Sequence, residues 1–103
     1  RDVVVLCSGW QDKINKEDTL FGGALTDVMV NTGLYEMGSD AAAIARDMWT
    51  NNKKDPAGYL EPSEHIARLK ANHLEDAVPY CLTLNLTDKV PELAIEGETL
   101  ILM

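Results

Sequence analysis

The sequence predicts a layered α/β chain, α/β/α in cross-section, with a small mixed sheet. An apolar run rich in β-branched residues opens the chain at residues 3–7, three amphipathic helical stretches follow, and short apolar segments close it. This order of strand, helices and strands is typical of folds in which helices cover a sheet. The opening strand is of the kind that lies mid-sheet, covered on both faces. We therefore expect the sheet to be incomplete without an N-terminal portion that precedes Arg1.

The first helix is predicted from its ends and its apolar face. After a loop at residues 8–14, Asn15 is a good N-cap because its side-chain oxygen can accept from the backbone N–H of Asp18. The sequence Asn31-Thr32-Gly33 predicts the end of the helix, with Gly33 as a left-handed cap. The residues that recur at helical spacing and form the apolar face are Leu20, Phe21, Ala24, Leu25 and Val28.

Two further helices and a turn are expected next. Ser39 and Asp40 cap a second helix that frays at residues 51–54, and Asp55-Pro56 starts a turn. A third helix runs from Pro62-Ser63 to about residue 71. The side chains expected to face inward are Ala41, Ile44, Ala45 and Met48 on the second helix, and Ile66, Leu69 and, as an open alternative, His73 on the third.

The last third of the chain is expected to supply strands. Residues 78–84 form the second strand candidate, and Pro79 fits a strand end or an edge position. Glu96-Gly97-Glu98 then links two short apolar pieces, residues 93–95 and 100–102, as a hairpin or turn.

Composition limits the classes of function. At 103 residues and 46% apolar, the chain is at most one globular domain. Its net charge of −8, with scattered basic residues, disfavours a nucleic-acid groove. Residues 3–7 are the longest apolar run, too short to cross a membrane, and no leader is present, so we expect a cytoplasmic protein. Cys7 and Cys81 are predicted to be buried thiols rather than a disulfide.

Glu17 and Asp18 are the candidate metal ligands. Glu17 precedes the apolar face of the first helix by one turn, and carboxylates near a strand end are well placed to hold a hard cation. The structural alternative is also open, because acids favour first helical turns and Asp18 can complete a capping box with Asn15.

Cys7, Ser8 and Gly9 are candidate substrate-binding residues. Backbone donors of this turn and the Ser8 hydroxyl could cradle a phosphate, and Cys7 could instead be a nucleophile. The competing interpretation is a structural Cys followed by an ordinary turn, with Gly9 required for a close approach.

Ser63, His65 and Arg68 form the second candidate group for substrate binding. Arg68 could bind a phosphate or sulfonate bidentately, and it could instead pair with Glu64 at i, i+4. Ser63 could equally be an N-cap, and His65 lies off the apolar face of its helix.

Five segments in this order resemble the C-terminal half of the 2-phosphosulfolactate phosphatase family. That family shows a strand ending in Cys-Ala-Gly, a loop with Ser-x-Glu-Asp, then Ser-x-His-Gly-Arg-x-Leu, an Asp before a strand ending in Cys, and a late Val-Pro. The corresponding segments here are VVVLCSGW, NKEDTLFGGAL, SEHIARL, EDAVPYC and DKVPEL.

The chain departs from the family pattern at several positions. Ser8 stands where Ala is usual, and Asn15 replaces Ser but keeps an N-cap. Ile66 stands where Gly is expected and Ala67 where Arg is expected. Arg68 follows one position later, so it is a candidate from its own chemistry rather than from the family.

The resemblance implies a magnesium-dependent phosphatase that releases sulfolactate in the coenzyme M pathway. Glu17 and Asp18 would hold Mg²⁺, and the substrate would be a small anionic phosphate ester. Residues 1–103 would be one α/β domain, the C-terminal half of a longer phosphatase-like protein and inactive alone. Its partner would be the missing N-terminal half, with a homo-oligomer left open. The alternatives are a non-catalytic interaction domain and a hydrolase with Cys7 as nucleophile.

Overall fold

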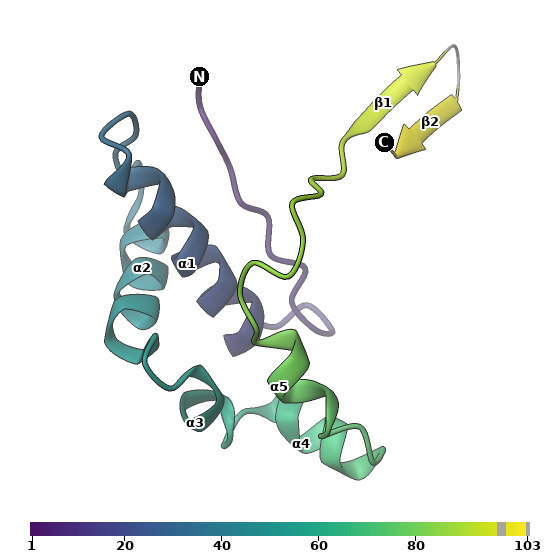
Figure 1. The fold of residues 1–103 in the computed structure, drawn as a ribbon. Coiled ribbons are helices and arrows are strands. Elements are labelled where there is room, and N and C mark those ends of the chain that lie inside the picture. Colours follow the sequence, from purple (N-terminus) through teal and green to yellow (C-terminus); the bar gives the residue numbers. More distant parts are fainter. Residues whose placement is uncertain (97–98, 103) are drawn as a thin grey trace.

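The structure is a computed structural model that describes the backbone of residues 1–96 and 99–102 and the side chains of residues 1–94. It is mostly helical and carries one antiparallel hairpin, which projects away from the helices (Figure 1). The elements in order are α1 (Lys16–Asn31), α2 (Asp40–Asn52), α3 (Pro56–Leu60), α4 (Glu64–Ala71), α5 (Ala77–Cys81), β1 (Leu93–Glu96) and β2 (Thr99–Leu102). No helix in this part of the chain is both long and apolar enough to span a membrane.

The helix ends follow the sequence closely. Asn15 accepts from the backbone N–H groups of Glu17 and Asp18 at 2.9 and 3.3 Å, so the predicted N-cap is confirmed. Ser39 caps α2 by accepting from Ala42 N–H. Beyond α1, Gly33 has φ +79°, the left-handed conformation expected of a glycine that ends a helix.

Helices α1 and α2 pack side by side through a close backbone contact (Figure 1). A Cβ on Gly23 would lie 1.8 Å from the carbonyl oxygen of Ala45, so only glycine fits this crossing. One turn further along α1, Asp27 pairs with Arg46 at 2.9 Å, and Arg46 also donates to Asn31. Asp27 is buried, so Arg46 provides the charged partner that a carboxylate between two packed helices needs.

A small core joins α1, α3 and α4. Its buried members are Leu20, Leu60 and Ile66. The half-buried side chains packed against them are Met48, Trp49, Tyr59, Leu69, Val78 and Leu82. Leu20, Ala45, Ile66 and Leu69 thus take the inward positions that helical spacing predicts.

Several predicted inward positions are exposed instead. Ile44 is 60% exposed and Phe21 66%, because α1 and α2 each contact a neighbour along only part of the predicted apolar face. His73 follows the end of α4 with φ 58° and is exposed. Cys7 and Cys81 are free thiols as predicted, but both are exposed rather than buried.

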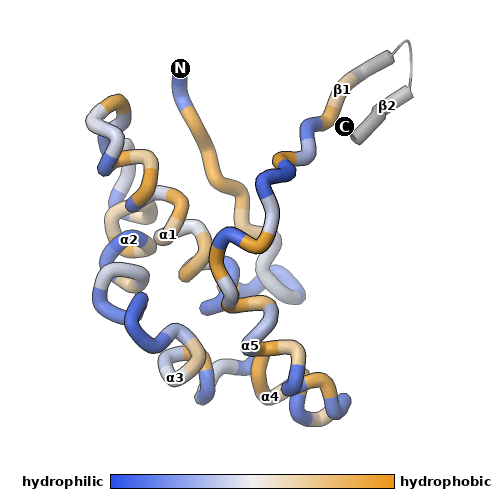
Figure 2. Tube along the Cα trace, viewed as in Figure 1, coloured by the Kyte–Doolittle hydropathy of each residue, from blue (hydrophilic) through white to orange (hydrophobic). Residues whose placement is uncertain are grey.

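The predicted strand at residues 3–7 is not formed in the structure. This segment is hydrophobic along its length (Figure 2), yet Val4 is 87% and Leu6 91% exposed. A strand needs a neighbouring backbone, and among the described residues the backbone of residues 1–9 makes no backbone hydrogen bond. The layered sheet expected from the sequence is therefore absent from the described part.

The predicted strand at residues 78–84 is wrong. Residues 77–81 form the short helix α5, and Val78 and Leu82, one turn apart, pack against the core. Pro79 lies in the first turn of this helix. Backbone N–H groups of the first turn have no partner within the helix, so a proline that lacks an N–H breaks no helical hydrogen bond there. A short apolar run does not distinguish the two structures by periodicity alone.

The predicted hairpin is confirmed by its strand pairing. β1 and β2 pair antiparallel, with Leu93 opposite Leu102 and Glu96 opposite Thr99. Gly97 and Glu98, which belong to the predicted connection, lie outside the described residues.

Candidate functional site

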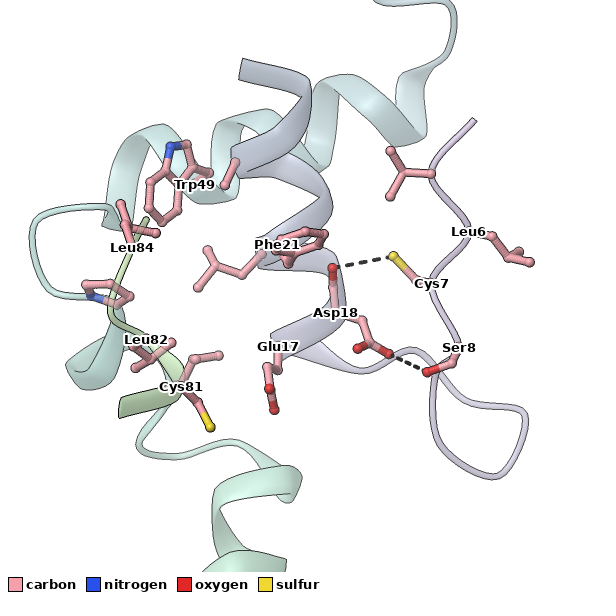
Figure 3. Close-up of a pocket in the computed structure, with 15 residues that line it drawn as sticks. Leu6, Cys7, Ser8, Glu17, Asp18, Phe21, Trp49, Cys81, Leu82 and Leu84 are labelled. Atoms are coloured by element: carbon pink, nitrogen blue, oxygen red, sulfur yellow. Dashed lines mark hydrogen bonds between the residues drawn. The ribbon is translucent and has the colours of Figure 1, made fainter. Parts of the chain in front are cut away.

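A pocket of about 360 Å³ lies between the N-terminal segment, α1 and α5 (Figure 3). Its walls are mostly apolar, with the two candidate acids Glu17 and Asp18 on one side. The lining residues are Val5, Leu6, Cys7, Ser8, Glu17, Asp18, Leu20, Phe21, Ala24, Trp49, Pro56, Leu60, Cys81, Leu82 and Leu84. This lining contains no Lys, Arg or His, so the described walls offer no cationic side chain to an anion.

Asp18 ties the N-terminal segment to the start of α1. Its Oδ2 accepts from the backbone N–H of Gly9 at 2.8 Å and from the Ser8 hydroxyl at 3.2 Å. The Cys7 thiol lies 3.4 Å from the Asp18 carbonyl oxygen. Figure 3 shows this contact and the hydrogen bond from Ser8 to the Asp18 carboxylate. The Asp18 carboxylate thus holds the loop, whereas the predicted capping box would have used it for the N–H of Asn15.

Gly9 cannot be replaced without moving the loop. It has φ +67°, and a Cβ would lie 2.5 Å from the carbonyl oxygen of Lys13. Lys13 is bonded to Trp10 through two backbone hydrogen bonds, which close a tight turn. The glycine that the sequence marks for close approach is therefore needed by the loop itself.

Glu17 reaches a second candidate residue. Its Oε2 lies 2.6 Å from His65 Nε2, which joins the first turn of α1 to the first turn of α4. Both side chains are partly exposed, at 41% and 32%. Two candidate groups that are 48 positions apart in the sequence therefore meet at the edge of the pocket.

Arg68 and Ser63 lie outside the pocket wall. The Arg68 guanidinium stacks on the Trp10 ring at 4.4 Å from its centre, rather than pairing with Glu64. Its Nη2 is buried and has no hydrogen-bond partner among the described residues. Ser63 is buried, and its hydroxyl accepts from Ile66 N–H as the N-cap of α4.

The structure thus brings some predicted site residues together and separates others. Cys7, Ser8, Glu17 and Asp18 share the pocket wall, Gly9 is bonded behind it, and His65 joins through Glu17. Cys81, Leu82 and Leu84 also line the pocket, which a strand at residues 78–84 does not predict. The helical spacing of Val78 and Leu82 is the signal that could have found them.

The acid pair provides oxygen ligands of the kind that Mg²⁺ binds. Glu17 and Asp18 each use one carboxylate oxygen in the contacts above and keep a second oxygen. Mg²⁺ is usually held by one or two carboxylates together with waters and substrate phosphates, so the pair fits this mode of binding. Among the described residues, no three His, Cys, Asp or Glu side chains gather as a complete protein cage for a metal.

Comparison with known proteins places the chain among phosphatases of one described family. The family model described as 2-phosphosulpholactate phosphatase matches residues 1–96. A probable 2-phosphosulfolactate phosphatase from Synechocystis is 29% identical over 99 residues, which are 94% of this chain and 41% of that protein. Relatives with the same name from Gloeobacter violaceus and Pseudothermotoga lettingae are 33% and 30% identical, over 92% and 86% of this chain.

The chain spans about two fifths of the length of these curated relatives: 41%, 38% and 38% respectively. No solved structure matches the chain.

Proposed function

The chain belongs to the 2-phosphosulpholactate phosphatase family, and from this premise we propose that it forms part of an enzyme that hydrolyses a small phosphate monoester. The proposed substrate is 2-phosphosulfolactate, which gives sulfolactate and phosphate, as the names of the relatives suggest. Because the chain covers two fifths of those relatives, we propose that the complete site also needs residues from the remainder of a family-length protein.

One observation carries the proposal. The acid pair and the Ser-x-His segment, both matched to the family by their sequence, meet through the 2.6 Å contact between Glu17 and His65. Neither helix needs this contact for its own hydrogen bonding, because α1 is capped by Asn15 and α4 by Ser63. The contact therefore favours a shared site over two unrelated helix starts.

We propose that Glu17 and Asp18 contribute to a Mg²⁺ site. When bound, Mg²⁺ offsets negative charge on the phosphoryl oxygens of the substrate. In this proposal, His65 orients the Glu17 carboxylate, and Ser8 and Gly9 orient that of Asp18 through their hydrogen bonds. Each acid is thus held in one direction before it meets a ligand.

We assign anion binding to Arg68, which lies on α4 outside the pocket wall and stacks on Trp10. Arg68 has a buried Nη2 with no partner in the described structure, which leaves donor capacity for a phosphate or sulfonate oxygen. The N–H of Gly9 already donates to the Asp18 carboxylate. We therefore propose that Cys7, Ser8 and Gly9 position Asp18 rather than bind the phosphate.

The proposal is tested in a chimera of family length. Residues 1–96 replace the matched region of the Synechocystis relative, and phosphate release from 2-phosphosulfolactate is measured with and without Mg²⁺. Glu17→Gln keeps the shape of the side chain but removes its charge, so we expect turnover to fall on the order of 100-fold. Glu36→Gln, which changes an exposed loop acid, is the matched control and should leave turnover unchanged.

Two outcomes would contradict the proposal. If the Glu17→Gln chimera keeps full turnover, Glu17 is not a ligand in the site. A folded Cys7→Ser chimera that loses turnover while Glu17→Gln keeps it would favour a thiolate nucleophile, although the Cys7 thiol has no described histidine contact.

A further inference from the structure

Residues 3–6 have the side-chain arrangement of a strand without its neighbours. A Cβ built on Gly22 of α1 would lie 3.7 Å from Val5 Cγ1 and 3.6 Å from Cys7 Sγ, so both side chains are directed at the helix. Val4 and Leu6 alternate with them and are 87% and 91% exposed. Figure 3 shows Leu6 pointing away from α1 and Cys7 pointing toward it. This two-residue alternation is that of a strand covered by a helix on one face.

The backbone of this segment is also unsatisfied by the described chain. Among residues that the structure describes, no hydrogen bond involves the N–H or C=O groups of residues 3–6. Both edges of the segment are therefore open to pairing, and its outward face is apolar. An apolar segment of β-branched residues with two free edges and one helix-covered face suits an interior position in a sheet.

We propose that residues 3–6 pair with a strand supplied by the part of a family-length protein outside the matched region. This part comprises more than half of the Synechocystis relative, because the chain covers 41% of it. The partner strand would be apolar and β-branched, and would bond to the exposed N–H and C=O groups of Val4 and Leu6. This pairing rests on the proposed function, which requires the remainder of a family-length protein, and it names residues 3–6 as the place where that remainder binds. The exposure and hydrogen bonding that support the pairing do not depend on phosphatase activity.

A second copy of the chain is the less suitable occupant. Each chain carries a net charge of −8, and two such chains would repel each other on association. Pairing with the remainder of the protein needs no such approach of identical charges. The two occupants also differ in a measurable way, since only self-association depends on the concentration of this chain alone.

Hydrogen exchange of the individual amides tests the pairing directly. The 103-residue chain is coexpressed with the remainder of the Synechocystis relative, which is that protein without its 99 matched residues. We expect the two polypeptides to copurify as a 1:1 complex. Exchange at the amides of residues 3–6 should slow on the order of 100-fold or more in the complex relative to the chain alone.

Substitutions on the exposed face give the matched comparison. Val4→Lys or Leu6→Lys places a charge where the proposed sheet would be covered, so the affinity of the complex should fall by about tenfold or more. Val90→Lys is the control, because Val90 is 81% exposed and lies far along the chain. All three positions are exposed in the chain alone, so circular dichroism should show the same helical content in each variant.

Two results would contradict the proposed strand pairing. Polypeptides that purify apart, or a complex in which residues 3–6 exchange as fast as in the chain alone, would overturn the inference. Concentration-dependent protection of these amides without the remainder would assign the surface to a second copy instead. A complex that protects the amides but releases no phosphate would keep this inference and count against the proposed function.

Discussion

Asp18 shows how one residue can serve both the fold and a site. The sequence offered two roles, a metal ligand and a capping residue, and the structure adds a third. Its carboxylate accepts from Ser8 and Gly9 and so fixes the N-terminal segment on α1. The sequence could not predict this contact, because a hydrogen bond across nine or ten positions of loop depends on the loop conformation. The glycine at position 9 was a signal that this loop makes a close approach.

The loop-holding role of Asp18 predicts a loss of stability. Asp18→Ala removes the acceptor of two hydrogen bonds, one of them from a half-buried backbone N–H, so unfolding should require about 1–3 kcal/mol less free energy. Urea denaturation followed by circular dichroism measures the change. Glu36→Ala in an exposed loop is the control and should have no comparable effect. An Asp18→Ala variant as stable as the parent would limit this residue to a role in binding.

At the scale of elements, the sequence predicted helices better than strands. Helix starts are local events, so Asn15, Ser39 and Ser63 could be assigned as caps from a few neighbouring residues. Strand formation depends on a partner backbone, which no local pattern contains. The segment at residues 3–7 has strand composition but no described partner, and residues 77–81 satisfy their backbone as a helix instead.

The close contact between α1 and α2 predicts that a methyl group is tolerated at Gly38, before α2, but not at Gly23 in the helix crossing. Gly23→Ala would force a methyl group against the carbonyl of Ala45, which should destabilise the chain by about 1–3 kcal/mol. Gly38→Ala has nothing within 4 Å and no left-handed φ, so its effect should stay within about 0.5 kcal/mol. Parallel thermal and urea unfolding of the two variants makes the comparison. Equal stability would contradict the close helix crossing.

The whole molecule is expanded for its length. Its radius of gyration is 15.6 Å, whereas a compact chain of this size is expected at about 13 Å. The described core contains few fully buried side chains, and large apolar residues such as Val4, Leu6 and Phe21 are exposed. Composition alone could not predict this, because a 46% apolar sequence would suffice for a compact domain. The proposed burial of this surface against the remainder of a family-length protein would account for the exposed apolar side chains, since the chain spans about two fifths of its relatives.

The chain alone is therefore predicted to be inactive. Its pocket wall carries two carboxylates and no described cationic side chain, and the net charge of −8 opposes the approach of a small anionic ester. We expect phosphate release from 2-phosphosulfolactate to stay at background for the 103-residue chain with Mg²⁺, and to rise in the family-length chimera.

The assay must separate a missing site from a misfolded chain. Circular dichroism of the isolated chain should show the helices before the assay is performed, so that background turnover reports on the site. If the isolated chain turns over and Glu17→Gln abolishes that turnover, these 103 residues contain a sufficient site. The proposed need for the remainder would then be wrong, while the role of Glu17 would stand.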